Sequence, residues 1–331
     1  MAYTEVDDSE AFFQVKLYTG NGSDDKAITL DGTTDMQPDL VWTKNRVAET
    51  SDDPHLWFDS VRGVTNYLSS NSSAAEATDA DTLDAFQSDG FKIDDDTKIN
   101  TNSETYVAWC WKESATSGFD IVTYTGTGSG TTVSHSLSAK PGWMLAKNKG
   151  ATGGWMAWHK GLPDSGDKVL YFHLNSAIQD EQMFNDTEPT SSVFSVSADS
   201  NLSSNTYVAY LWAEKKGFSK FLNYVGNSST DGKFLYCGFR PAFVMTKRTD
   251  TTSAWYVWDN KRNGFNPTNN PLFAYHTSTE NTGTVRIDFL SNGFKFRHAD
   301  SDHNGSSGTY IFMAFAEAPL VNSKGVPCNA R

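Results

Sequence analysis

The chain carries five sequence landmarks that occur three times in the same order, and this repetition limits its possible folds more than any other feature. The first landmark reads LYTGNG, TYTGTG and NYVGNS, beginning at Leu17, Thr123 and Asn223. A proline-led apolar run that ends in lysine follows, as PDLVWTK, PGWMLAK and PAFVMTK. The third and fourth landmarks are LWFD, MAWH and YVWD, and then SDGFKI, SSVFSV and SNGFKF. The fifth reads SETYVAWCWKE, SNTYVAYLWAE and SGTYIFMAFAE.

The spacing between equivalent residues predicts three domain-sized units. The landmark prolines Pro38, Pro141 and Pro241 are 103 and 100 residues apart. A period of about 100 residues matches a small domain and is much longer than a solenoid repeat. It overrules the two domains that a length of 331 residues suggests. We therefore predict an N-terminal arm (1–11), three repeats (12–115, 116–216 and 217–318) and a C-terminal tail (319–331).

Each unit has the residue pattern of antiparallel β-structure. The landmark runs are short and rich in aromatic and branched residues, and clusters of Gly, Asn, Asp and Ser separate them. The fifth landmark is apolar on both faces, which is typical of a central strand covered on each side. SDG and SNG, before Phe91 and Phe294, predict tight hairpin turns. The fold class expected is all-β, with three tandem antiparallel β-sandwich, jelly-roll-like repeats. Residues 74–86 are the best candidate for a short helix.

Composition excludes several classes of function. The chain has 27 basic and 40 acidic residues, a formal charge of −13, which argues against nucleic acid as a partner because phosphate contacts need positive surfaces. The acidic N-terminus lacks the pattern of a signal peptide. No apolar run approaches the roughly 20 residues that span a bilayer, so we expect a soluble protein without membrane insertion. Three cysteines without a CxxC pair predict neither a disulfide framework nor a zinc site.

A search for catalytic and metal-binding motifs favours a protein that is not an enzyme. There is no nucleophile elbow and no P-loop, and the histidines form no close-spaced pair of ligands. His159 lies on a landmark where the other copies have Asp59 and Asp259, and we expect it at the surface. Residues 300–305 imitate the start of a calcium loop, but Ile311 stands where the final glutamate belongs. We predict no catalytic, cofactor-binding or metal-binding residue, with calcium in this loop as the alternative.

Tryptophans are the remaining candidates for ligand contacts, because aromatic rings stack on the faces of sugars. Most of them belong to predicted strands and are expected in the core. Trp155 and Trp255 follow turns rich in Gly or Ser and are the two that we single out as ligand-binding residues.

The landmark strings also resemble a known family. YTGNG, PDLVWTKNR, FDSVRG, NSETYVAWCWK and the later GFRPAFVMTKRT and YIFMAFAEAP, from about Phe13 to Pro319, are similar to a repeat family of unknown function. That family occurs in tail-fibre-like and other virion proteins of tailed phages, especially marine and cyanobacterial ones. The resemblance implies a virion component on the outside of the particle, and it supplies no catalytic residues.

These observations lead to an expected function. We predict a non-enzymatic structural protein on the outside of a phage virion, assembled in the host cytoplasm, with other virion proteins as partners. A knob-like capsid decoration protein bound to the major capsid protein is favoured over a tail or tail-fibre-tip subunit, because the first repeat begins too early for a fibre anchor and shaft. The alternative is a module that binds a host receptor or surface glycan. A depolymerase is a third class and requires a cleft with convergent carboxylates.

Overall fold

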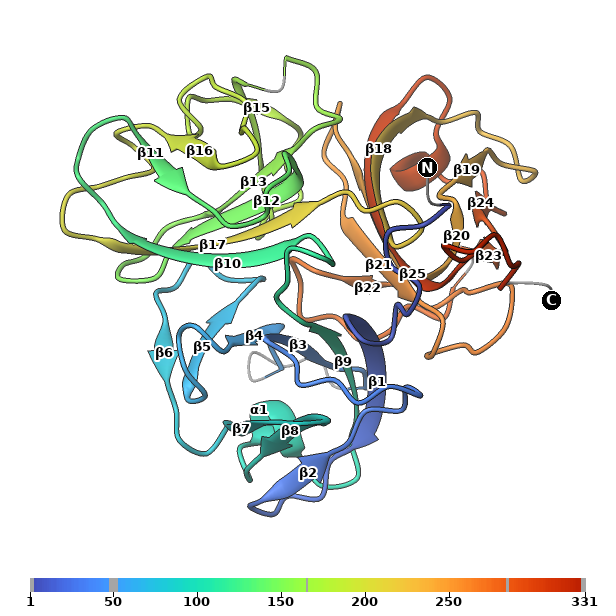
Figure 1. Cartoon of the computed structure of the whole chain (residues 1–331), viewed down its shortest axis with the longest axis horizontal. Coiled ribbons are helices and arrows are strands. Elements are labelled where there is room, and N and C mark those ends of the chain that lie inside the picture. The colour runs from blue at the N-terminus through green and yellow to red at the C-terminus, as the bar shows by residue number, and fades with distance from the viewer. Residues whose placement is uncertain (1–2, 48–52, 165, 284–285, 329–331) are drawn as a thin grey trace.

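The computed structural model describes residues 3–47, 53–164, 166–283 and 286–328, and it consists almost entirely of antiparallel strands in three lobes around a common centre (Figure 1). The strands of the first lobe are β1 Phe13–Thr19, β2 Lys26–Ile28, β3 Leu40–Asn45, β4 Leu56–Asp59, β5 Asn66–Ser69, β6 Ala77–Thr78, β7 Leu83–Gln87, β8 Gly90–Ile93 and β9 Thr105–Trp111. A short helix, α1 Thr97–Asn100, precedes β9.

The second and third lobes contain the remaining elements. The second lobe has β10 Phe119–Thr125, β11 Thr131–Ser134, β12 Pro141–Asn148, β13 Trp155–His159, β14 Lys168–Tyr171, β15 Gln179–Asp180, β16 Val193–Val196 and β17 Thr206–Ala213. The third has β18 Ser219–Val225, β19 Phe234–Tyr236, β20 Phe239–Arg248, β21 Trp255–Asp259, β22 Leu272–Phe273, β23 Ile287–Leu290, β24 Gly293–Phe296, α2 Ser301–Asn304 and β25 Thr309–Pro319.

The large sheets of the three lobes have the same strand order. They run β1-β9-β3-β4-β5-β6, β10-β17-β12-β13-β14-β15 and β18-β25-β20-β21-β22. In each, the first strand of the lobe pairs with the last, and the last pairs with the proline-led strand. A smaller sheet accompanies each large one, as β2-β8-β7, β11-β16 and β19-β24-β23. The all-β, antiparallel sandwich class expected from the sequence is therefore confirmed.

Alternation along the last strand of a lobe divides its side chains between two cores. In β9, Ala108 and Cys110 pack between the two sheets of the first lobe, whereas Trp109 and Trp111 point to the centre of the molecule. A strand places successive side chains on opposite faces, so a strand whose residues are all apolar can bury both of its faces. The same division occurs in β17, which explains why the fifth landmark is apolar throughout.

The central core joins the lobes and is continuous with the interior of the third. It contains buried aromatic residues from all three large sheets, among them Trp42, Trp143, Tyr210, Phe243 and Trp255. The lobes are consequently not separate domains joined by linkers, because the second face of each large sheet is buried against the other lobes.

The chain ends pack against the molecule itself. Thr4 and Val6 of the N-terminal arm are buried, and the amide of Glu5 donates to the carbonyl of Lys216 at 2.9 Å. Asp7 accepts a 2.6 Å hydrogen bond from the amide of Ser323 in the tail. The N-terminal arm thus contacts the connection between the second and third lobes, and the tail contacts the arm.

Two local features concern the predicted turns and helices. The hairpins at SDG and SNG are present, with Gln87 paired to Gly90 and Leu290 to Gly293. The helix expected at residues 74–86 is wrong, because this segment contains β6 and the start of β7. Its alanines suit a helix, but pairing to neighbouring strands overrides that weak preference. Within the described part of the chain, no helix has the length and apolar character needed to cross a membrane.

Candidate functional site

Equivalent backbone hydrogen bonds connect each lobe to the next and close a ring. The amide of Glu76 donates to Lys149 O at 3.0 Å, that of Ile178 to Thr249 O at 3.0 Å, and that of Glu280 to Arg46 O at 3.1 Å. The first bond joins lobes one and two, the second joins two and three, and the third returns from three to one. The contacts between lobes are therefore as repetitive as the sequence.

The landmark lysines lie in these junctions and are buried. Lys147 donates to Ser73 O of the first lobe at 3.2 Å, and Lys247 donates to Asn175 O of the second lobe at 3.2 Å. Each also donates to a carbonyl of its own lobe, at 2.8 Å. Burial lowers the pKa of Lys147 to about 8 and the pKa of Lys247 to about 7. Lys44, the equivalent lysine of the first lobe, is buried and donates to Asn45 O at 2.7 Å.

The last residue of the third landmark makes a second set of contacts between lobes. Asp59 accepts from the Tyr210 hydroxyl at 2.6 Å, and Asp259 accepts from Nε1 of Trp109 at 3.1 Å. Each of these carboxylates is also paired with a buried arginine three residues later, Arg62 and Arg262. Buried charges need such partners, because an unpaired ion in the interior is strongly unfavourable.

His159 completes this set, and its expected place at the surface is wrong. Only 1 % of the residue is exposed. Its Nδ1 accepts from the amide of Gly161 at 2.9 Å, so the proton resides on Nε2, which donates to Phe312 O of the third lobe at 3.1 Å. Burial lowers the pKa of His159 to about 3, which keeps the ring neutral. Both nitrogens are used in structure.

The two tryptophans that we singled out as ligand-binding residues lie in the same junctions. Trp155 is 0 % and Trp255 is 1 % exposed. Nε1 of Trp155 donates to Ser69 O of the first lobe at 2.9 Å, and Nε1 of Trp255 donates to Tyr171 O of the second at 3.2 Å. Neither ring presents a face on which a sugar can stack. Their turns approach the neighbouring lobe instead of solvent.

The residues of the calcium-like segment are used as caps. Asp300 accepts from the amide of Asp302 at 2.7 Å at the start of α2, and Asp302 accepts from the Tyr256 hydroxyl at 2.8 Å. Asn304 is buried, where it accepts from the amide of Asn227 at 3.1 Å. Asn100 and Asn201 hold the first landmark of the other lobes in the same way. The segment forms a helical turn here, and this arrangement differs from a calcium loop.

An acidic cluster occurs at the outer sheet of the first lobe. Carboxylate oxygens of Asp25, Asp84 and Asp94 lie within 4.8 Å of one another. The ammonium of Lys92 pairs with Asp25 at 2.6 Å and with Asp84 at 2.5 Å. A lysine thus already balances part of the negative charge that a cation would neutralise.

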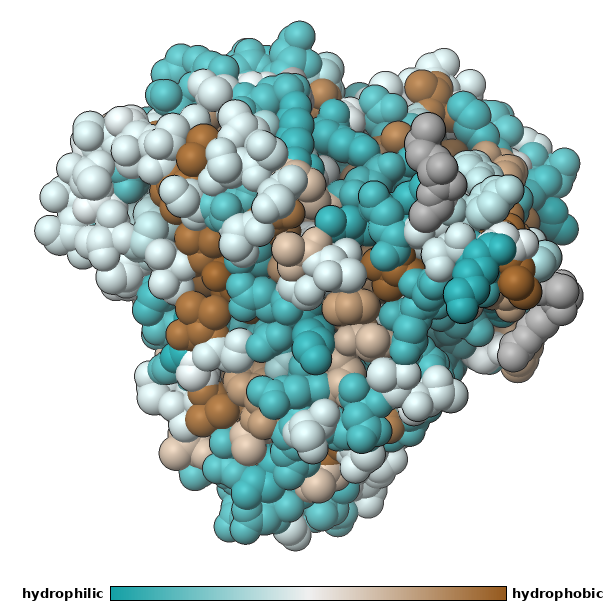
Figure 2. Space-filling model, in the orientation of Figure 1, coloured by the Kyte–Doolittle hydropathy of each residue, from teal (hydrophilic) through white to brown (hydrophobic). Residues whose placement is uncertain are grey.

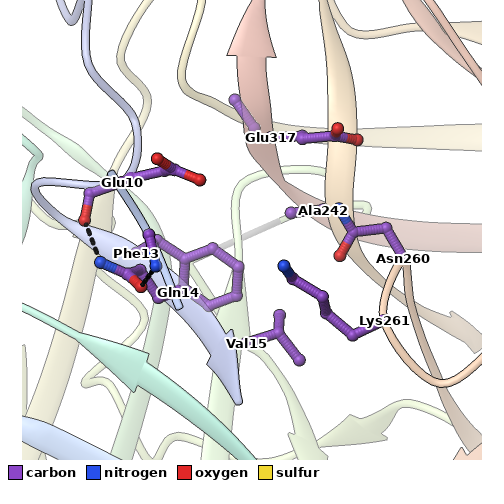
Figure 3. Close-up of a pocket in the computed structure, with 10 residues that line it drawn as sticks. Glu10, Phe13, Gln14, Val15, Ala242, Asn260, Lys261 and Glu317 are labelled. Carbon is purple, nitrogen blue, oxygen red and sulfur yellow. Dashed lines mark hydrogen bonds between the residues drawn. The ribbon is translucent and has the colours of Figure 1, made fainter. Parts of the chain in front are cut away.

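A small cavity lies where β1 of the first lobe meets the third lobe (Figure 3). Its volume is about 70 Å³, and its polar lining includes Glu10, Gln14, Lys261 and Glu317. Gln14 is fixed by a 2.9 Å bond to Glu10 O. Sites for small organic ligands usually enclose about 300–1,000 Å³, so this cavity suits water better than a substrate.

Two exposed aromatic side chains are the features that sequence reasoning missed. Phe234 and Tyr236 of β19 are 41 % and 57 % exposed. The surface is otherwise mostly hydrophilic, although apolar groups interrupt it at several places, including the third lobe at the upper right of Figure 2. The missed signal was a difference between copies: pairing with the fourth landmark places Ala27 and Thr132 where the third lobe has Phe234.

The comparison with known proteins identifies the family without giving an activity. No curated protein matches the chain. A family described as a domain of unknown function, DUF7483, matches residues 8–319, which include nearly all of the three lobes. The chain belongs to this family of domains of unknown function.

Proposed function

We propose that this chain is a non-enzymatic structural protein displayed on the outside of a phage virion. The observation that carries the proposal is the closed ring of equivalent junctions around a shared aromatic core. In this ring the recurring polar side chains, including Lys147, Lys247, Asp59, His159 and Asp259, are buried in contacts that hold lobes together. Repeated residues that hold the lobes together suit a rigid display unit. The resemblance of the landmarks to virion proteins is the reason for proposing a virion as its location.

A knob-like decoration of the capsid, bound to the major capsid protein, is the placement that we favour. The lobes form one compact unit, and the N-terminal arm packs along the connection to the third lobe. Such a unit suits attachment as a globular knob better than a role as an elongated shaft. A subunit of the tail or of a fibre tip is the alternative, and it would bring the third lobe's exposed aromatics near a host surface.

Labelling intact particles tests the proposal. Purified virions of a phage that encodes the chain are incubated with gold-labelled antibodies raised against the folded protein and are imaged by electron microscopy. We expect gold on the capsid, at many copies per particle. Gold confined to the tail would select the alternative placement. Particles that neither bind the antibody nor contain the chain by mass spectrometry would contradict a virion role altogether.

A further inference from the structure

The small sheet of the third lobe has an outer face built from six positions. Phe234 pairs with Lys295, which pairs with Asp288, and these three form one row across β19, β24 and β23. Tyr236, Gly293 and Leu290 form the next row. The residues between them, such as Leu235 and Phe294, are buried in the lobe. The outer face therefore combines two aromatic rings with charged side chains.

Glycines provide the support on which the two rings lie. A Cβ atom added at Gly293 would come within 3.0 Å of the Phe234 ring, so this ring leans over the glycine in the middle of the face. A Cβ at Gly238 would lie 3.4 Å from the Tyr236 hydroxyl oxygen. Each ring thus lies next to backbone without a side chain, and a large part of each residue is exposed. Little further conformational freedom is lost when such a ring binds a ligand.

Paired charges surround the rings. Asp231 accepts from Lys295 at 2.7 Å and from Arg297 at 3.3 Å, and Arg297 also pairs with Asp288 at 3.2 Å. Asp231 is 78 % exposed at its side chain, and Arg297 is 43 % exposed. These groups offer both hydrogen-bond donors and acceptors, while their charges largely cancel.

The first lobe provides an internal comparison. Its outer sheet has the same polar arrangement, with Lys92 paired to Asp25 and Asp84. At the aromatic positions it has Ala27 and Thr29, and the second lobe has Thr132 and Ser134. In the first lobe the charged pairs thus occur without exposed rings, whereas the third lobe adds both rings on the same face. The rings are not required by the fold of the sheet.

We propose that this face of the third lobe binds an uncharged glycan. Aromatic rings pack against the apolar C–H face of a pyranose, and neighbouring paired charges donate to and accept from its hydroxyl groups. A strongly anionic polymer fits less well, because the paired charges beside the rings leave no net positive charge and the protein carries a charge of −13. The inference rests on the proposed display function and names the ligand that the displayed unit would contact. It can be tested with the purified chain alone.

Isothermal titration of the full chain with uncharged oligosaccharides tests this site. The probes are hexamers of α-1,4-glucose, β-1,4-glucose, β-1,4-mannose and N-acetylglucosamine, with heparin as the anionic comparison. We expect saturable binding of at least one uncharged hexamer, and at least a tenfold loss of affinity in F234A/Y236A. The matched control T132A/S134A changes the equivalent strand of the second lobe and should bind like the wild type.

Four titration results would overturn the proposal. They are no binding of any uncharged hexamer, binding of heparin alone, equal affinity in F234A/Y236A, and loss of binding in both double variants. Circular dichroism verifies that each variant is folded. Sedimentation of the chain without sugar tests whether a second copy of the chain occupies this face. A wild-type dimer that the F234A/Y236A substitutions dissociate would assign the face to a second copy and contradict glycan binding. Absence of the chain from virions would refute display without affecting these titrations.

Discussion

The hydroxyl of Tyr210 in the second lobe donates a 2.6 Å hydrogen bond to Oδ2 of Asp59 in the first. Both residues are buried, and the same carboxylate is paired with Arg62. One acidic group therefore serves its own lobe and its neighbour at once. Since folding of a lobe and attachment between lobes use the same side chain, we expect changes at this position to affect the whole molecule.

Removing the hydroxyl alone measures the contact between the two lobes. Tyr210→Phe keeps the ring but leaves the buried carboxylate with one partner fewer, and hydrogen bonds to charged groups contribute about 1.5–3 kcal/mol. We expect the free energy of unfolding in urea to fall by about that amount. Tyr236→Phe is the control, because Tyr236 is 57 % exposed, and its stability should stay within about 0.5 kcal/mol of the wild type. Equal stability of the two variants would contradict the role given to Tyr210.

The contribution of the Asp59–Arg62 ion pair to stability can be tested by introducing the residues that the second lobe has at these two positions. Asp59→Ala leaves the Arg62 guanidinium buried without its closest carboxylate, which typically costs about 3–5 kcal/mol. The second lobe has His159 and Leu162 at the equivalent places, and it buries both. We expect the double variant D59H/R62L to recover at least half of the lost stability in the same urea titration. A double variant as unstable as Asp59→Ala would show that the histidine and leucine of the second lobe cannot replace the ion pair of the first.

The strand pattern and the repeat could be read from the sequence because they depend on local properties. Tyr106, Tyr207 and Tyr310 are 101 and 103 residues apart. Each stacks on a tyrosine of its lobe's first strand, with ring centroids 5.0, 4.9 and 4.8 Å apart. Apolar runs and turn residues indicate such strands directly. How the large sheets face one another is not a local property, because an apolar face predicts burial without naming the surface that covers it.

The burial of Trp155, Trp255 and His159 was missed for this reason. Each begins or ends a short strand beside turn residues, a context in which solvent is the usual neighbour. Here another lobe occupies that place. Phe234 and Tyr236 were missed for a different reason: searching for what the copies share conceals the positions at which one copy differs, and ligand contacts that belong to one lobe occur at such positions.

Lys247 predicts how stability depends on pH. Its pKa is lowered from 10.5 to about 7 by burial, so between these values the unfolded chain binds a proton that the folded chain does not. By linkage, the contribution of Lys247 to stability rises as pH increases from about 7 and is lost as pH falls through the folded pKa. Lys247→Met removes this proton difference. We expect the urea midpoint of the wild type to increase between pH 7 and 9 more than that of the variant.

The matched control for this titration is a lysine at the surface. Lys324 lies in the exposed tail, and Lys324→Met should leave the slope of stability against pH as in the wild type. A Lys247→Met variant with an undiminished slope would mean that Lys247 is charged in the folded protein. His159, whose pKa is lowered to about 3, contributes in the same direction at lower pH, with stability decreasing as pH falls below about 6.5.

The shared core predicts that the lobes do not fold independently. The rings of Phe243 and Phe315 in the third lobe lie 5.7 and 5.6 Å from that of Trp111 in the first, and Phe315 lies 5.3 Å from Phe13. A chain ending at residue 216 exposes these aromatic surfaces, each of which buries roughly 150–250 Å² in a folded core. We expect this truncated chain to bind a hydrophobic dye and to lack the near-ultraviolet circular dichroism of fixed tryptophans, whereas the full chain unfolds in one thermal transition. A sharp transition of the truncated chain with native-like near-ultraviolet signal would instead show that two lobes are stable without the third, and that the central core follows from folding of the lobes instead of being required for it.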